Sequence, residues 1–201
     1  MHISWHGLSC VKIQTSDAVL VINPYQNSFG TQMPKFKTNV VLSTDTANDQ
    51  TNNFDSLQGD PFVITTAGEY ESHGLFVTGV QYNGGQVMYL IEAEGMTLAH
   101  LGTVTDELND DQLAKLEGVD VLFLPLTCEE GRSCSRMVSQ IEPRVIIPIQ
   151  YKSKGFKMEL AALETFTKEM GMKDAKGEDK IILKAKDLPV EETQVKILNA
   201  V

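Results

Sequence analysis

The chain has 201 residues, 42% of them hydrophobic, and a formal net charge of −10 from 17 Lys and Arg against 27 Asp and Glu. This size and composition are typical of one globular domain with a sizeable core, so we expect a single domain over residues 1–201. The acidic balance argues against a nucleic-acid partner, because such binding depends on Lys and Arg neutralising phosphates. No stretch approaches the ~20 apolar residues that span a bilayer, which argues against a membrane partner. With only three cysteines and no disulfide framework, a soluble cytoplasmic protein is expected.

The first half of the chain has the pattern of β-strands. Short apolar runs bounded by turn residues predict strands at 11–13, 19–22, 40–42, 62–64, 75–78, 86–91 and 96–100. Asn83-Gly84 predicts a hairpin turn, because the Asn-Gly dipeptide readily adopts positive φ at both positions. The polar segment 44–53 has no periodicity and is expected to be a loop.

The second half alternates between helical and strand patterns. Helices are expected at 109–117, 134–141 and 160–170, and strands at 119–124, 145–149, 181–183 and 195–198. Asn109 followed by Gln112 predicts a capped helix start, and Gly118 its end. Two β-rich halves with helices concentrated in the second favour sheet packed on sheet with helices outside. Val121, Phe123, Ile146 and Ile147 are expected in the interior.

Several segments, in chain order, resemble the metallo-β-lactamase superfamily, specifically its predicted Zn-dependent hydrolase branch. They are Ile-Ser-Trp-His-Gly-Leu at 3–8, Val-Ile-Asn-Pro-Tyr at 21–25, Gly-Glu-Tyr-Glu at 68–71, Ala-His-Leu-Gly at 99–102, the strand at 119–126 and the segment at 141–151. The resemblance covers nearly the whole chain. It implies an α/β fold, the αββα four-layer sandwich of this family, with the active site at one edge of the two sheets.

The same resemblance implies where metal ligands would lie. The family holds one or two metal ions with T-H-x-H-x-D-H, H-L-G-D and H-Y motifs, and the metal lowers the pKa of bound water towards ~7. In this chain the seven ligand positions carry Asp45, Ala47, Asp49, Gln50, His100, Thr103 and Gln150. Only Asp49 and His100 are kept. A further position, where the family has an aspartate near the cations, carries Asn23.

This residue set is poorly suited to zinc, which prefers three or four imidazole, thiolate or carboxylate ligands. We therefore expect no cofactor, with a divalent metal weakly bound by Asp45, Asp49 and carbonyl oxygens as the alternative. The expected function is that of a catalytically inactive binding or scaffold protein for an unknown small molecule or protein. The alternative is a hydrolase with an altered or weak metal site. The sequence does not predict an oligomeric state.

The resemblance brings Asp45, Asp49 and His100 to one edge of the sheets. Two carboxylates repel each other unless a positive group lies between them. We therefore expect a protonated His100 that donates to Asp45 or to water, with its pKa raised above ~6.5.

Two other groups of residues have competing interpretations. His6 is either a packed strand histidine or a residue that reaches the old site. Cys128 and Cys134 are either a redox or metal-binding pair or, for Cys134, part of the apolar stripe of its helix.

Overall fold

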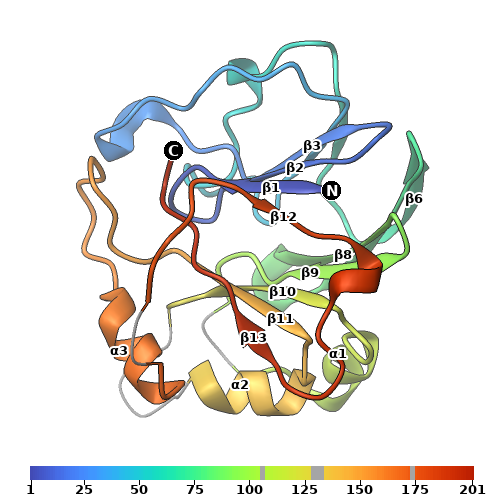
Figure 1. The fold of residues 1–201 in the computed structure, drawn as a ribbon. Coiled ribbons are helices and arrows are strands. Elements are labelled where there is room, and N and C mark those ends of the chain that lie inside the picture. The colour runs from blue at the N-terminus through green and yellow to red at the C-terminus, as the bar shows by residue number, and fades with distance from the viewer. Residues whose placement is uncertain (105–106, 128–133, 173–174) are drawn as a thin grey trace.

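The computed structural model describes residues 1–104, 107–127, 134–172 and 175–201 (Figure 1). The strands of the first sheet are β1 (His2–Trp5), β2 (Val11–Gln14), β3 (Val19–Ile22), β4 (Val40–Leu42), β5 (Phe62–Ile64) and β12 (Ile181–Ile182). Those of the second are β6 (Gly68–Ser72), β7 (Leu75–Gln81), β8 (Val87–Ala93), β9 (Met96–His100), β10 (Val121–Pro125), β11 (Val145–Ile149) and β13 (Gln194–Val195). The α-helices are α1 (Asp110–Lys115), α2 (Cys134–Ile141) and α3 (Leu163–Glu169).

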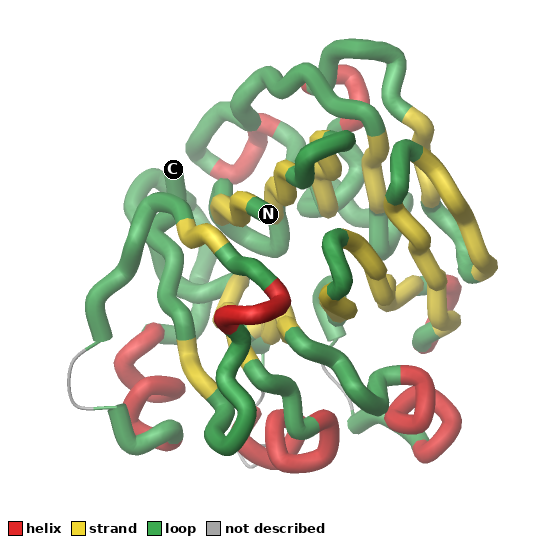
Figure 2. Tube along the Cα trace, turned by 45° about the vertical axis from the view of Figure 1, so that its right-hand side comes forward, coloured by secondary structure: helices red, strands yellow, loops and turns green. Residues whose placement is uncertain are grey.

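Each of the two sheets is mixed. The first has the order β12-β1-β2-β3-β4-β5 and the second β13-β11-β10-β9-β8-β7-β6. Strands β3, β4 and β5 run parallel to one another, as do β9, β10, β11 and β13, whereas the hairpins β6–β7 and β7–β8 are antiparallel. The sheets lie face to face, with β1–β3 above β8–β11 in Figure 1, and Figure 2 shows the long β6–β8 strands at one side.

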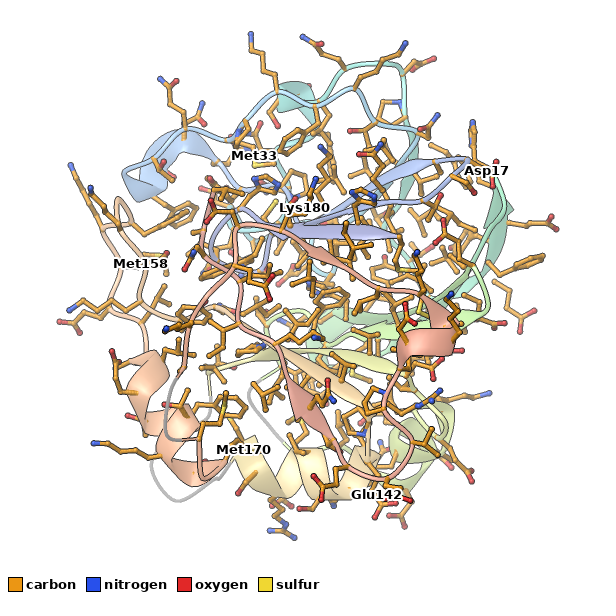
Figure 3. All side chains as sticks on the ribbon, in the orientation of Figure 1. Asp17, Met33, Glu142, Met158, Met170 and Lys180 are labelled. Carbon is orange, nitrogen blue, oxygen red and sulfur yellow. The ribbon has the colours of Figure 1, made fainter. Side chains whose placement is uncertain are left out.

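Buried apolar side chains fill the space between the sheets (Figure 3). Trp5, Tyr89 and Phe123 are among the largest fully buried residues. The prediction that Val121, Phe123, Ile146 and Ile147 lie in the interior is confirmed, since all four are 0% exposed. Residues from both halves of the chain contribute to this core.

The outer faces of the two sheets are covered differently. Helices α1, α2 and α3 lie beneath the second sheet in Figure 1. The first sheet is covered by loops that carry two 3-10 turns, η1 (Asn27–Phe29) and η2 (Phe54–Ser56). A separate cluster of Leu8, Cys10, Val21, Tyr25 and Met33 is buried beneath these loops. The outer layer on this side is therefore held by apolar loop residues instead of amphipathic α-helices.

Several sequence predictions needed adjustment. The predicted strands and helices are present, but α1 and α3 are shorter than expected, and the strand predicted at 195–198 is only the two-residue β13 at Gln194–Val195. Asn109 forms the predicted capping box with Gln112. At the β7–β8 turn, positive φ occurs at Gly84 and Gly85 but not at Asn83. Strand β6 was not predicted, because its sequence Gly-Glu-Tyr-Glu-Ser has no apolar alternation. None of the helices in the described ranges is long and apolar enough to cross a membrane.

Candidate functional site

The residues singled out by the resemblance lie where parallel strands of both sheets end. Asn23 follows β3, Asp45 comes three residues after β4, His100 is the last residue of β9 and Gln150 follows β11. Because the carboxyl ends of parallel strands meet at the same edge of a sheet, these side chains gather along one edge of the sandwich. Tyr89 ties the sheets together there, since its hydroxyl donates to the carbonyl oxygens of Ser43 and Ile64 at 3.0 and 3.2 Å.

His100 uses both ring nitrogens within the fold. The backbone N–H of Gly102 donates to Nδ1 at 3.0 Å, so the proton of the neutral ring lies on Nε2. Nε2 in turn donates to the carbonyl oxygen of Ser9 at 3.0 Å. The side chain is 0% exposed and packs near the Phe123 ring. His100 therefore joins a strand of the second sheet to a loop of the first through two backbone groups.

The environment of His100 favours its neutral form. Desolvation by burial lowers the pKa of His100 to about 4, although the hydrogen bond to the Ser9 carbonyl acts in the opposite direction. The prediction of a protonated His100 that donates to Asp45 is therefore wrong. The sequence did not reveal that backbone groups of Ser9 and Gly102 would form hydrogen bonds with both ring nitrogens.

Asn23 forms the centre of a buried network at the end of β3. Its Nδ2 donates to Ser9 Oγ at 3.1 Å and to Thr44 Oγ1 at 2.9 Å, and its Oδ1 accepts from the Thr44 backbone N–H at 2.9 Å. Asn23 has a φ of 53°, a left-handed conformation that asparagine tolerates better than most residues. All three side chains of this network are neutral and buried. A neutral amide here needs no cation nearby, whereas a carboxylate would.

Gly102 brings this network close to His100. Its φ is +69°, and a Cβ at this position would lie only 2.8 Å from the Thr44 side chain. Glycine is therefore required where the end of β9 approaches the loop after β4.

Gln150 pairs with Gln50 across the site. Its Nε2 donates to Gln50 Oε1 at 3.2 Å, and its backbone N–H donates to the carbonyl oxygen of Leu8 at 2.8 Å. Both Leu8 and Gln150 have positive φ, 48° and 58°, which is strained for residues other than Gly, Asn and Asp. The Oε1 atom of Gln150 is buried and has no hydrogen-bond partner among the described residues. Two positions where the family has histidines thus carry amides that bind each other.

The two acidic candidates are engaged differently. Asp45 holds its own loop, because its Oδ1 accepts from Ala47 N at 3.0 Å and its Oδ2 accepts from Gln86 Nε2 at 3.2 Å. Asp49 is exposed, and its carbonyl oxygen accepts from Gln26 N at 2.8 Å. Thr103 is partly buried just beyond Gly102. The sequence did not predict the hydrogen bond from Gln86 to Asp45, because Gln86 lies 41 residues along the chain, at the β7–β8 turn.

These donors do not fit the zinc site that the resemblance implies. Across the parts of the chain that the structure describes, no three His, Cys, Asp or Glu side chains form a group that could hold a metal ion. The oxygens and nitrogens that remain at the edge are mostly amides and hydroxyls, which are weak zinc ligands. The buried imidazole of His100 offers its only unprotonated nitrogen to Gly102.

The remaining candidates, His6 and Cys134, are both buried and bonded to other protein groups. His6 is buried against Phe36, and its ring nitrogens bond to Ser4 Oγ at 3.0 Å and the Val201 carbonyl at 2.8 Å. Burial lowers the pKa of His6 to about 4. Cys134 is buried on α2, as its apolar stripe predicted, but it is also disulfide-bonded, which was not expected from the sequence. Cys128 lies outside the described residues. Burial raises the pKa of the Cys10 thiol, which disfavours the nucleophilic thiolate.

Known proteins share this fold and part of this sequence. A family described as "Beta-lactamase superfamily domain" matches residues 2–150. A UPF0173 metal-dependent hydrolase from Lysinibacillus sphaericus is 26% identical, covering 76% of this chain and 86% of the relative. A structure from Thermotoga maritima, assigned to the Zn-dependent hydrolases of the metallo-β-lactamase superfamily, has a TM-score of 0.81 at 23% identity and 99% coverage of both chains. An isothiocyanate hydrolase from Delia radicum gut bacteria has a TM-score of 0.63 at 11% identity, covering 92% of this chain and all of the other.

Proposed function

Since the chain belongs to the β-lactamase superfamily, in its metallo-β-lactamase fold, we propose that it is a non-catalytic member that acts as a binding or scaffold protein. The proposal concerns the site and not the fold, because one fold supports many functions. Its partner is a small molecule or a protein, and its location is the cytoplasm.

The observation that carries this proposal is the state of His100. A metal-binding imidazole directs one unprotonated nitrogen at the ion and usually donates with the other. Here the unprotonated Nδ1 accepts from Gly102 and Nε2–H donates to Ser9. Binding a metal through either nitrogen would break a buried hydrogen bond, at a cost of about 1–3 kcal/mol for the group left unpaired.

The neutral side chains around His100 support the same proposal. In a metal site, carboxylates and imidazoles balance the charge of the ion. At this edge Asn23, Gln50 and Gln150 are amides that bond to other protein groups. The network is therefore internally paired without a cation, apart from Gln150 Oε1.

Equilibrium dialysis against zinc, with metal quantified per chain, tests the proposal. We expect no stoichiometric zinc in the native protein. The matched positive control carries Asp45→His, Ala47→His, Gln50→His, Thr103→Asp and Gln150→His, and when folded it should bind zinc. Stoichiometric zinc in the native protein, lost in His100→Ala together with metal-dependent hydrolysis, would overturn the proposal in favour of a hydrolase with an altered metal site.

A further inference from the structure

A second surface lies away from this edge, on the outer face of β6, β7 and β8. The register pairs Glu71 with Phe76 and Phe76 with Glu92, so that one row across three strands reads Glu-Phe-Glu. Glu69 lies two residues before Glu71 and faces the same side. We call Glu69, Glu71, Phe76 and Glu92 the acidic face.

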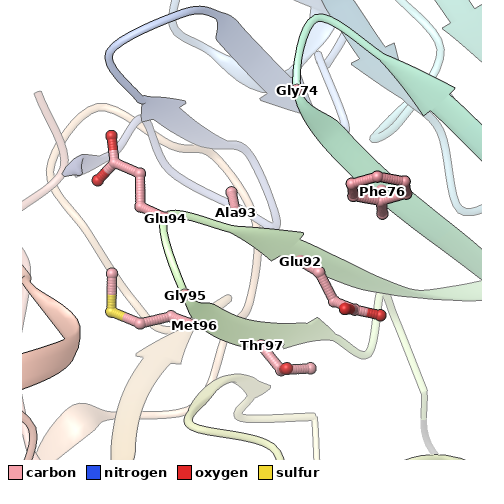
Figure 4. Close-up of a pocket in the computed structure, with 8 residues that line it drawn as sticks. All are labelled: Gly74, Phe76, Glu92, Ala93, Glu94, Gly95, Met96 and Thr97. Carbon is pink, nitrogen blue, oxygen red and sulfur yellow. The ribbon is translucent and has the colours of Figure 1, made fainter.

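This face is open and hollowed. Phe76 is 52% exposed, although it lies on β7, which is paired on both sides. Two hollows of about 380 and 370 Å³ share Phe76 and Glu92 as lining residues. Figure 4 shows Phe76, Glu92 and Thr97 next to one another on neighbouring strands. In Figure 1, β6 extends away from α1, α2 and α3.

The acidic face has unmatched charge. The ion pairs found among the described residues involve Glu94, Glu107 and Asp120, and none of them involves an acidic-face glutamate. In a protein partner, the side chains that neutralise this charge at neutral pH are those of Lys and Arg, with ammonium and guanidinium groups. The long apolar stems of Lys and Arg pack on aromatic rings while their heads reach carboxylates, so Phe76 fits the same partner.

The backbone beside this face is also open. Strand β6 is the last strand of its sheet and pairs on one side only, with β7. His73 and Gly74, both with positive φ, form a two-residue turn, so Ser72 and Leu75 are the bonded pair next to it. Hydrogen-bonded pairs alternate along an antiparallel ladder. The N–H and C=O groups of Glu69 and Glu71 therefore face the free edge.

We propose that the free edge of β6 is the docking site for an extended segment of another protein that carries Lys or Arg at alternate positions. Such a segment adds one strand to the sheet through the backbone groups of Glu69 and Glu71. Its alternate side chains lie opposite those two glutamates, where opposite charges are favourable. A second copy of this chain is a poor occupant, because pairing β6 with itself places carboxylates against carboxylates and the chain carries a net charge of −10.

The test uses a fluorescein-labelled peptide, Val-Lys-Val-Lys-Val-Lys-Val, and its counterpart with Glu in place of Lys. Fluorescence anisotropy of the full chain should show binding of the Lys peptide only. The double variant Glu69→Gln/Glu71→Gln should weaken that binding about tenfold, from the loss of two cross-strand charge pairs. The control Glu117→Gln/Glu159→Gln removes the same charge from exposed positions elsewhere and should leave binding unchanged.

Amide hydrogen exchange separates strand addition from simple charge attraction. In the free protein the amides of Glu69 and Glu71 should exchange rapidly, whereas that of Tyr70, bonded to β7, should be protected. The Lys peptide should then protect Glu69 and Glu71. Equal weakening in both double variants, no protection of these two amides, no binding at all, or binding of the Glu peptide would each overturn the proposal.

Discussion

The burial of His100 predicts a specific dependence of stability on pH. Its pKa is lowered from 6.5 to about 4 in the folded chain. In the unfolded chain the ring binds a proton below about pH 6.5, whereas the folded chain resists protonation until about pH 4. Acidification through this window therefore favours the unfolded state, so stability is lost as the pH falls.

The size of the effect follows from the two pKa values. Each pKa unit corresponds to about 1.4 kcal/mol, so the interval from 6.5 to about 4 corresponds to about 3 kcal/mol. Because the ring is 0% exposed, solvent screening does not reduce this figure substantially. The loss reaches its full value near pH 4, where the folded protein begins to bind the same proton.

Urea unfolding of the native chain and of His100→Gln, from about pH 8 to about pH 4, measures the contribution of His100 to the free energy of unfolding. The variant should be less stable by about 1–3 kcal/mol at neutral pH, because the Gly102 N–H loses its acceptor. Groups that titrate in both proteins, including His6, cancel in the difference between them. That difference should fall by about 3 kcal/mol over the window.

The exposed turn residue His73 supplies a matched control. When the free energy of unfolding is plotted against pH, the curve of His73→Asn should run parallel to that of the native chain. An NMR titration of the His100 ring should give a midpoint below about pH 5. Parallel native and His100→Gln curves, or a ring that titrates at its ordinary value, would refute the argument that His100 is buried and neutral.

Four further predictions concern the site and the core. EDTA should leave the thermal midpoint unchanged, and a drop of several degrees would reveal a stabilising metal ion. Asn23→Asp should lower the free energy of unfolding by about 1–3 kcal/mol at neutral pH, measured in urea, and the loss should shrink on acidification as the buried carboxyl protonates; unchanged stability would indicate a cation beside it. Phe123→Ala should cost about 3–5 kcal/mol, and a loss below about 1 kcal/mol would contradict its packing between the sheets. Near- and far-UV circular dichroism should give coincident thermal transitions if residues 1–201 unfold as the expected single domain, whereas two separate transitions would indicate two units.

The sequence predicted those parts of the fold that depend on local pattern. The apolar runs at β10 and β11 and the capping box of Asn109 specify their elements through side chains within a few residues of one another. Strand β6 was missed because its exposed residues carry no alternation, and its conformation comes from pairing with β7. The family motifs correctly located the edge of the site, because they mark the ends of strands that the local pattern also specifies.

The chemistry at that edge was only partly predictable. The loss of histidines at positions 45, 47, 50 and 150 is visible in the sequence. The hydrogen-bond partners of His100 are not visible there, because Ser9 lies 91 residues before His100 and offers a backbone oxygen that every residue has. The pKa of His100 was predicted in the wrong direction because burial outweighs any distant carboxylate.

The positive φ angles at Leu8, Asn23 and Gln150 have a consequence for how this family changes its chemistry. Main-chain bonds fix these turns: Gln150 N donates to the Leu8 carbonyl and Asn23 N to the Leu42 carbonyl. Such bonds do not depend on the identity of the side chain. A lineage can therefore exchange imidazoles for amides, or the reverse, by point substitutions while the backbone remains in place. The backbone of this edge is therefore compatible with either set of side chains, and a change between them requires point substitutions without refolding.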